Sequence, residues 1–209
     1  MSSSETPILR SALLVLTLIA SCLAQENPAL PSPPANPPEA GSIEAGVYRN
    51  SYLGLIYRLP EAWYVDTRIF KERLAEKNYN PAERTFVLLS AKQFPLGTPG
   101  LKFNPDLALM AINTSAFHNR AITTGNDYLT LMTPAMVNTL HDELIQLGAV
   151  INAGGRKFYR ADYKRPLGYQ AIVCTVWQEY VLVWTFVGET TAQLDELVKS
   201  MQSVSFGRH

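Results

Sequence analysis

The stretch that decides the fold is residues 154–187, GGRKFYRADYKRPLGYQAIVCTVWQEYVLVWTFV. It contains three runs of alternating or fully apolar residues, at 156–164, 168–177 and 180–187, with short links between them. Such runs predict β-strands, and links this short join antiparallel neighbours. We therefore expect a long antiparallel meander in the second half of the chain.

Shorter elements are expected on both sides of this meander. The same patterns predict further strands at 42–49, 53–59, 84–92 and 106–114, and a short edge strand at 203–206. A charged segment at 67–77 is compatible with a helix. Because the sheet is long and mostly antiparallel, the fold class is α+β.

Two more helices follow from capping and apolar spacing. Gly125-Asn126-Asp127 offers a cap before a helix that reaches Leu140, and Pro134 should kink or divide that helix. Thr190 or Thr191 caps a final helix with apolar residues at core spacing. Helices on both sides of a central sheet predict an α/β/α sandwich.

Two segments resemble the PsbP-like and Mog-like group of α/β/α sandwich proteins. Residues 48–63, YRNSYLGLIYRLPEAW, resemble its opening strand pair and Pro-x-x-Trp turn. Residues 180–206 are similar to its last strand, helix and closing strand. The group includes the photosystem II extrinsic protein, the Ran-binding Mog protein and exported bacterial proteins of unknown role. The resemblance covers about residues 46–207, implies a binding or accessory role, and supplies no catalytic residues.

The beginning of the chain predicts export. Residues 10–24 read RSALLVLTLIASCLA, so one cation precedes an apolar run and a stretch of small residues. This is the layout of a signal peptide, here over residues 1–24. The run is shorter than the roughly 20 residues that span a bilayer. We therefore expect an extracytoplasmic protein of a bacterium, either periplasmic, secreted or anchored as a lipoprotein.

Three fates of this leader fit its residues. Ile19-Ala20-Ser21-Cys22 resembles a bacterial lipobox, which would leave a lipid on Cys22. Cys22-Leu23-Ala24 equally suits ordinary signal peptidase, which would cut before Gln25. An uncleaved N-terminal anchor is the third fate.

A proline-rich linker is expected at residues 25–42, before a single domain at 43–209. Prolines recur in it among small and polar residues, at positions 28, 31, 33, 34, 37 and 38. Such a segment favours extended polyproline II geometry and acts as a semi-rigid spacer. A docking ligand for an aromatic groove is the alternative, because Pro31-Ser32-Pro33-Pro34 approaches a PxxP pattern.

The charge balance argues against a nucleic-acid binder. The chain has 18 Lys plus Arg and 18 Asp plus Glu, whereas such a protein needs a strongly basic face. We expect no cofactor, and membrane contact only through an N-terminal lipid. The expected partner is an unknown protein or envelope component.

The sequence contains no convincing catalytic or metal-binding motif. Cys174 lies in an apolar run and is interpreted as a buried small hydrophobe. His141-Asp142-Glu143 lacks the i, i+4 spacing of metal ligands, so a solvated helix end is favoured. Gly154-Gly155 precedes a strand rather than a helix, which indicates a tight turn and not a phosphate loop.

One uneven charge feature is a group of cations at 156–165. In a strand, Arg156, Arg160 and Lys164 share a face. They predict a small patch for anionic lipid, polysaccharide or an acidic partner. The alternative is a solvated sheet face or edge on which the cations discourage strand pairing.

These features favour an exported, non-catalytic binding or accessory protein. It is lipid-anchored if Cys22 carries a lipid. Two other hypotheses remain. One is a hydrolase or metal enzyme in which His118 or His141 meets carboxylates in a pocket. The other is a carrier for a small hydrophobic molecule, suggested by the aromatic residues of the meander.

Overall fold

The computed structural model describes residues 41–66, 84–117 and 120–207. The signal peptide, most of the proline-rich linker and the helix expected at 67–77 lie outside these residues, as do Cys22 and His118. Within the described ranges, no helix is long and apolar enough to cross a lipid bilayer.

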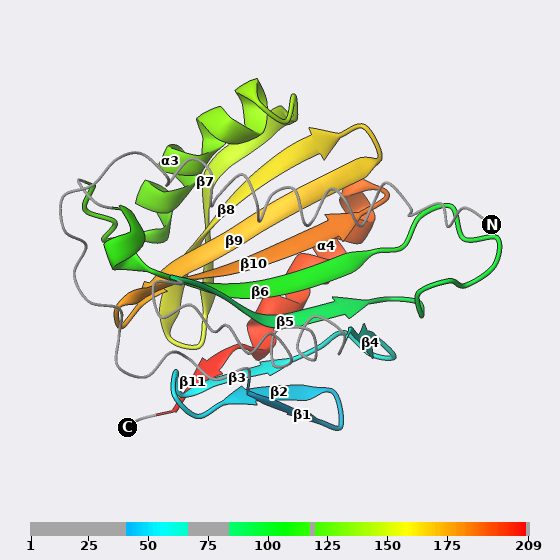
Figure 1. Ribbon diagram of the computed structural model, residues 1–209, viewed down its shortest axis with the longest axis horizontal. Coiled ribbons are helices and arrows are strands. Elements are labelled where there is room, and N and C mark those ends of the chain that lie inside the picture. Colours follow the sequence, from blue (N-terminus) through cyan, green and yellow to red (C-terminus); the bar gives the residue numbers. More distant parts are fainter. Residues whose placement is uncertain (1–40, 67–83, 118–119, 208–209) are drawn as a thin grey trace.

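A seven-stranded antiparallel sheet forms most of the molecule (Figure 1). Its strands, in spatial order, are β4 (Tyr64–Val65), β5 (Thr85–Lys92), β6 (Asp106–Asn113), β10 (Tyr180–Gly188), β9 (Gly168–Trp177), β8 (Arg156–Arg165) and β7 (Glu143–Ala153). The expected meander is confirmed, because β8, β9 and β10 are consecutive antiparallel neighbours.

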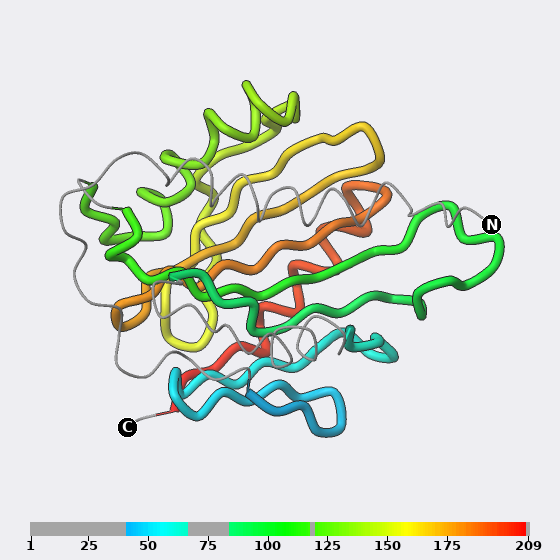
Figure 2. The backbone as a smooth tube through the Cα atoms, viewed as in Figure 1, coloured from blue at the N-terminus to red at the C-terminus, as the bar shows by residue number. Residues whose placement is uncertain are grey.

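A second, smaller sheet joins the two ends of the described chain. Its strands, in spatial order, are β1 (Ser42–Glu44), β2 (Val47–Asn50), β3 (Leu55–Arg58) and β11 (Ser205–Phe206). Figure 2 shows the red C-terminal segment beside the cyan strand with which it pairs. The pairing of β11 with β3 thus places C-terminal residues against the N-terminal strands.

Two α-helices lie in the described part of the chain, with two short 3₁₀ segments, Thr114–Phe117 and Ser200–Ser203. Helix α3 (Gly125–Asn138) begins after Thr124, whose hydroxyl accepts from the backbone N–H of Asp127 in a capping box. The cap therefore precedes the segment expected to provide it, Gly125-Asn126-Asp127, and that segment forms the first turn of the helix. Helix α4 (Thr191–Lys199) has the expected cap, Thr190.

The large sheet has an apolar core on each face. Alternate residues of β10 point to opposite sides, so Trp184 belongs to one core and Val183 to the other. The core that contains Trp184 lies under α4 and the small sheet. The core that contains Val183 lies under α3, with Tyr128 and Leu129 fully buried.

The expected α/β/α sandwich is wrong. The fold is mostly antiparallel strand in two sheets, and a sheet joins α4 in covering one face of the larger sheet. The prediction placed all strands in one central sheet. The N-terminal strands instead pair among themselves and with β11, because this arrangement buries Tyr48, Leu55 and Tyr57 against the large sheet.

Two local predictions also need correction. The strand expected at 42–49 is broken at Ala45 and Gly46, which have φ values of 46° and 72° and form a turn between β1 and β2. Strand β7 was not expected at all. Its pairing with β8 shifts register at two bulges, between Leu144 and Gln146 and between Leu147 and Ala149, which disrupt the alternation that marks a strand.

Candidate functional site

A surface hollow lies where two hairpins of the large sheet meet the end of the small sheet. Its volume is about 440 Å³. The residues that line it come from the β7–β8 turn, the β9–β10 turn and β11: Gly154, Gly155, Arg156, Trp177, Gln178, Phe206 and Gly207. We call this hollow the Arg156 pocket.

The cation of this pocket is stacked on aromatic rings. The guanidinium carbon of Arg156 lies 3.6 Å from the ring centroid of Trp177 and 5.3 Å from that of Phe206. Contacts at these distances are cation–π interactions. The two rings also touch each other, with centroids 4.9 Å apart.

The two rings that contact Arg156, those of Trp177 and Phe206, are held in place by contacts with other parts of the fold. The indole N–H of Trp177 donates to the backbone carbonyl of Leu53 at 2.7 Å, which links the large sheet to the β2–β3 turn. Phe206 stacks on the buried ring of Phe158, with centroids 6.5 Å apart. The stacked group therefore rests on the core and has little freedom to move.

Arg156 has no carboxylate partner among the residues that the structure describes, since none lies within ion-pair distance of it there. Partial burial lowers the pKa of its guanidinium, and no acid of the described ranges counters that effect. An arginine with its face on a ring still has in-plane N–H donors, which suit a planar anion.

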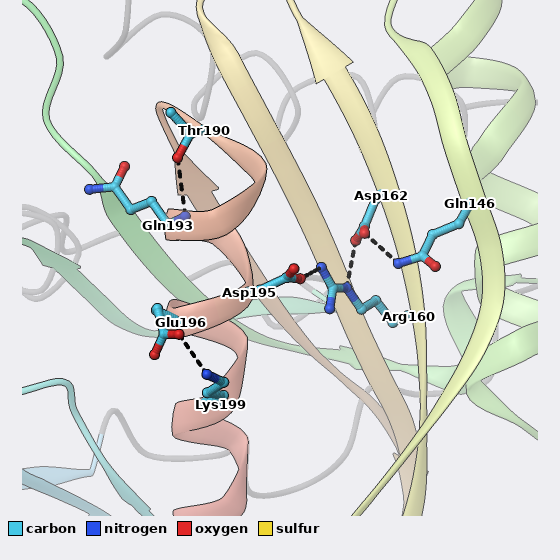
Figure 3. Close-up of polar contacts among 8 residues, drawn as sticks. All are labelled: Gln146, Arg160, Asp162, Thr190, Gln193, Asp195, Glu196 and Lys199. Carbon is cyan, nitrogen blue, oxygen red and sulfur yellow. Dashed lines mark hydrogen bonds and ion pairs between the residues drawn. The ribbon is translucent and has the colours of Figure 1, made fainter.

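Arg160 is engaged in a structural network instead (Figure 3). Its Nε donates to Asp162 at 2.7 Å, and its Nη2 donates to Asp195 of α4 at 2.6 Å. Gln146 of β7 donates to the other oxygen of Asp162. Burial lowers the pKa of Arg160, but these two acids outweigh it and raise the pKa overall. Arg160 thus ties β7, β8 and α4 together.

Lys164 lies at the far end of β8 from Arg156. Its Nζ is 3.6 Å from a carboxylate oxygen of Glu143, and both side chains are exposed. The three cations of the predicted patch therefore share a strand face, but their neighbouring residues differ. Arg160 and Lys164 have acidic partners, and Arg156 alone of the three lies in the pocket.

The residues suggested for catalysis are dispersed. Cys174 is fully buried, as expected, and its thiol donates to the carbonyl of Gly125 at 3.2 Å, while burial raises its pKa. His141 is exposed, but Asp142 beside it is buried and pairs with Arg165, so the expected solvated helix end is wrong for this acid. Across the described ranges, no three His, Cys, Asp or Glu side chains are grouped to hold a metal ion.

The aromatic residues behind the carrier hypothesis are divided between the two cores. Tyr180 and Trp184 are fully buried on one face of the large sheet, and Tyr163 is fully buried on the other. Of these aromatics, Trp177 is the one that lines the pocket.

Part of this pocket could have been found from sequence. The link between β8 and β9 pairs Arg165 with Gly168, and the register then places Tyr159 opposite Cys174. The same register, continued to the end of the hairpin, brings Arg156 opposite Trp177. Phe206 and Gly207 come from the small sheet, and no local pattern links them to Arg156.

Comparisons with known proteins give structural similarity only. No protein-family model matches the chain, and no curated protein matches it. The solution structure of cyanobacterial PsbP (CyanoP) from Synechocystis sp. PCC 6803 is similar at 12% identity, covering 83% of this chain and 99% of that chain, with a TM-score of 0.48. The crystal structure of LpqN, involved in cell envelope biogenesis of Mycobacterium tuberculosis, is similar at 14% identity, covering 74% of this chain and 83% of that chain, with a TM-score of 0.39. A PsbP protein, of the kind that the sequence resembles, is thus among the similar structures, and at these values neither similarity carries an argument about function.

Proposed function

We propose that this chain is an exported binding or accessory protein that recognises an anionic group at the Arg156 pocket. The observation that carries the proposal is the guanidinium of Arg156, which lies 3.6 Å from the Trp177 ring centroid at the wall of a 440 Å³ hollow. Three cations of β8 have acidic partners, and none of them lines this hollow: Arg160, Lys164 and Arg165.

Arg156 is suited to bind an anion because its side chain is partly desolvated and restricted in movement. Stacking on Trp177 and partial burial remove water from one face of the guanidinium, and charge-assisted hydrogen bonds are stronger where water is excluded. The rings and the core beneath them also fix the side chain in place. A ligand therefore has less side-chain entropy to offset on binding.

Export rests on the leader at residues 10–24 rather than on the pocket. Metabolic labelling with palmitate distinguishes the two main routes. A label that is lost in Cys22→Ser identifies the lipid-anchored form, and an unlabelled chain that begins at Gln25 identifies the secreted form.

Replacing Arg156 by glutamine should abolish the response of the pocket to anions. The indole N–H of Trp177 reports on the site, because this ring lies under the guanidinium. We expect its NMR resonance to shift and saturate when acetate or inorganic phosphate is added to the native chain at constant ionic strength, and to stay in place in Arg156→Gln.

The matched control is Lys157→Gln, which removes the same charge from the next, exposed residue. This variant should respond as the native chain does. An equal response in Arg156→Gln would contradict the proposal, because the anion would then bind elsewhere or act only through ionic strength.

A further inference from the structure

We infer that the ligand of the Arg156 pocket is a monocarboxylate carried on a ring or apolar body of about the size of one amino-acid residue or one sugar. This inference rests on the proposed function and specifies its ligand. The charge of the pocket, the plane of its cation and the nature of its walls each lead to it.

Among the residues that the structure describes, the lining of the pocket provides a single positive charge, that of Arg156. Its other lining residues are three glycines, two aromatic residues and the neutral Gln178. The adjacent cation, Lys157, follows Arg156 in the strand, so its side chain points to the opposite face. A phosphate or sulfate dianion is usually bound by several cations, by a helix N-terminus or by clustered backbone N–H groups. One arginine matches one carboxylate.

The guanidinium carbon of Arg156 lies 3.6 Å from the Trp177 ring centroid, a distance that favours a guanidinium plane lying along the ring. Arginine offers two parallel N–H donors in that plane, which match the two oxygens of a carboxylate. A carboxylate bound in this way lies in the guanidinium plane, and the group to which it is attached extends away from Arg156 into the hollow.

The walls suit a flat or apolar body. The rings of Trp177 and Phe206 are half-buried, so part of each remains open to solvent. Gly155 has open space where a side chain would stand, since a Cβ built there meets no atom within 4 Å. The volume of about 440 Å³ lies in the usual range for small-ligand sites, roughly 300–1,000 Å³.

A carboxylate of this kind can come from the last residue of a peptide or from an acidic sugar. The two sources share the group that Arg156 would bind and differ in the body that the aromatic rings would contact. N-acetylphenylalanine and galacturonate therefore serve as the two probes of source.

The test is a titration of the full chain, followed by the Trp177 indole resonance and by calorimetry. The probes are phenylacetate, phenylacetamide and phenyl phosphate, which keep the ring and change the charged group. We expect phenylacetate to bind at least tenfold more tightly than either of the others. Of the two probes of source, the one that binds more tightly identifies it: N-acetylphenylalanine a peptide C-terminus, and galacturonate an acidic sugar.

Two variants test the geometry. Arg156→Lys keeps the charge but lacks the planar pair of donors, so it should bind phenylacetate at least tenfold more weakly. Gly207→Leu adds bulk at the pocket wall, where a Cβ fits at 3.7 Å from the carbonyl oxygen of Gly54 and the backbone φ is outside the left-handed region. It should block phenylacetate without lowering the thermal unfolding temperature, while Lys157→Gln should bind as the native chain does.

The outcomes separate the two proposals. If phenyl phosphate binds as tightly as phenylacetate, or if Arg156→Lys keeps full affinity, the monocarboxylate inference is overturned and anion recognition stands. If Arg156→Gln still responds to acetate, anion recognition at this pocket fails, and the inference fails with it.

Discussion

Replacing Trp184 by alanine is expected to lower the free energy of unfolding by about 3–5 kcal/mol, the range typical of large aromatic residues removed from a core. Trp184 has 0% exposure and is among the largest fully buried side chains. Its ring meets Tyr57 of the small sheet at 6.1 Å and Phe158 of the large sheet at 5.6 Å, both edge to face. The indole therefore joins the two sheets.

Urea denaturation measures this loss, and Trp184→Phe is the matched control. Phenylalanine retains an aromatic ring and removes the indole N–H, which has no hydrogen-bond partner in the part of the chain that the structure describes. The free energy of unfolding should therefore fall much less in Trp184→Phe than in Trp184→Ala. A loss of less than about 1 kcal/mol for Trp184→Ala would mean that the two sheets are not joined through this ring.

Trp184→Ala should also change the conformation of the Arg156 pocket. Trp184 packs on Phe158, Phe158 stacks on Phe206, and Phe206 lies against the cation of the pocket. A cavity under Phe158 should loosen this stack. The Trp177 indole resonance of Trp184→Ala should therefore broaden or move even without ligand.

The second large effect is expected at a buried ion pair. Replacing Asp106 by alanine should cost about 3–5 kcal/mol, because it leaves the ammonium of Lys92 buried without its acid. Lys92 Nζ lies 3.3 Å from Asp106 Oδ2, and their side chains are 10% and 8% exposed. Burial raises the pKa of Asp106, while Lys92 and Arg165 act to lower it. The cations thus offset only part of the desolvation cost, since the pKa of Asp106 is raised overall.

A double-mutant cycle measures the pair. The cycle consists of Lys92→Met, Asp106→Leu and the variant that carries both. The double variant removes both charges and keeps apolar volume, so it should recover most of the stability lost in Asp106→Leu. The exposed pair of Glu196 and Lys199 is the control, and its removal should change stability by less than about 1 kcal/mol. If the Asp106→Leu and double variants lose equal free energy of unfolding, removing Lys92 gives no recovery, and the buried charge of Lys92 is not stabilised by Asp106.

Local features of the sequence were sufficient for the central meander. The strands β8, β9 and β10 are long, have strong apolar patterns and are joined by short links, so their neighbours and register follow from adjacent residues. The same register, extended beyond its last pair, Tyr159 with Cys174, leads to the observed contact of Arg156 with Trp177. The predicted patch included Arg156 for its charge and did not include the aromatic ring across the hairpin.

Strand β7 shows why local patterns fail at some positions. Gly148, with a φ of 83°, lies within the second bulge, where the register shifts between Leu147 and Ala149. A bulge inserts a residue and reverses the sides to which the following side chains point. The residues of β7 therefore lack a steady period of two, and their sequence alone favours a helix end at Glu143 where the structure has the first residue of a strand.

Neighbouring residues and apolar patterns were enough to predict the β8–β9–β10 meander, the cap of α4 and the burial of Cys174. Three features came to light in the folded molecule alone: β11 pairs with β3, a second sheet covers one face of the first, and Phe206 meets Arg156. These contacts join segments that are far apart in the chain. Their free energy comes from burying two apolar surfaces against each other, and a short window of sequence contains only one of the two.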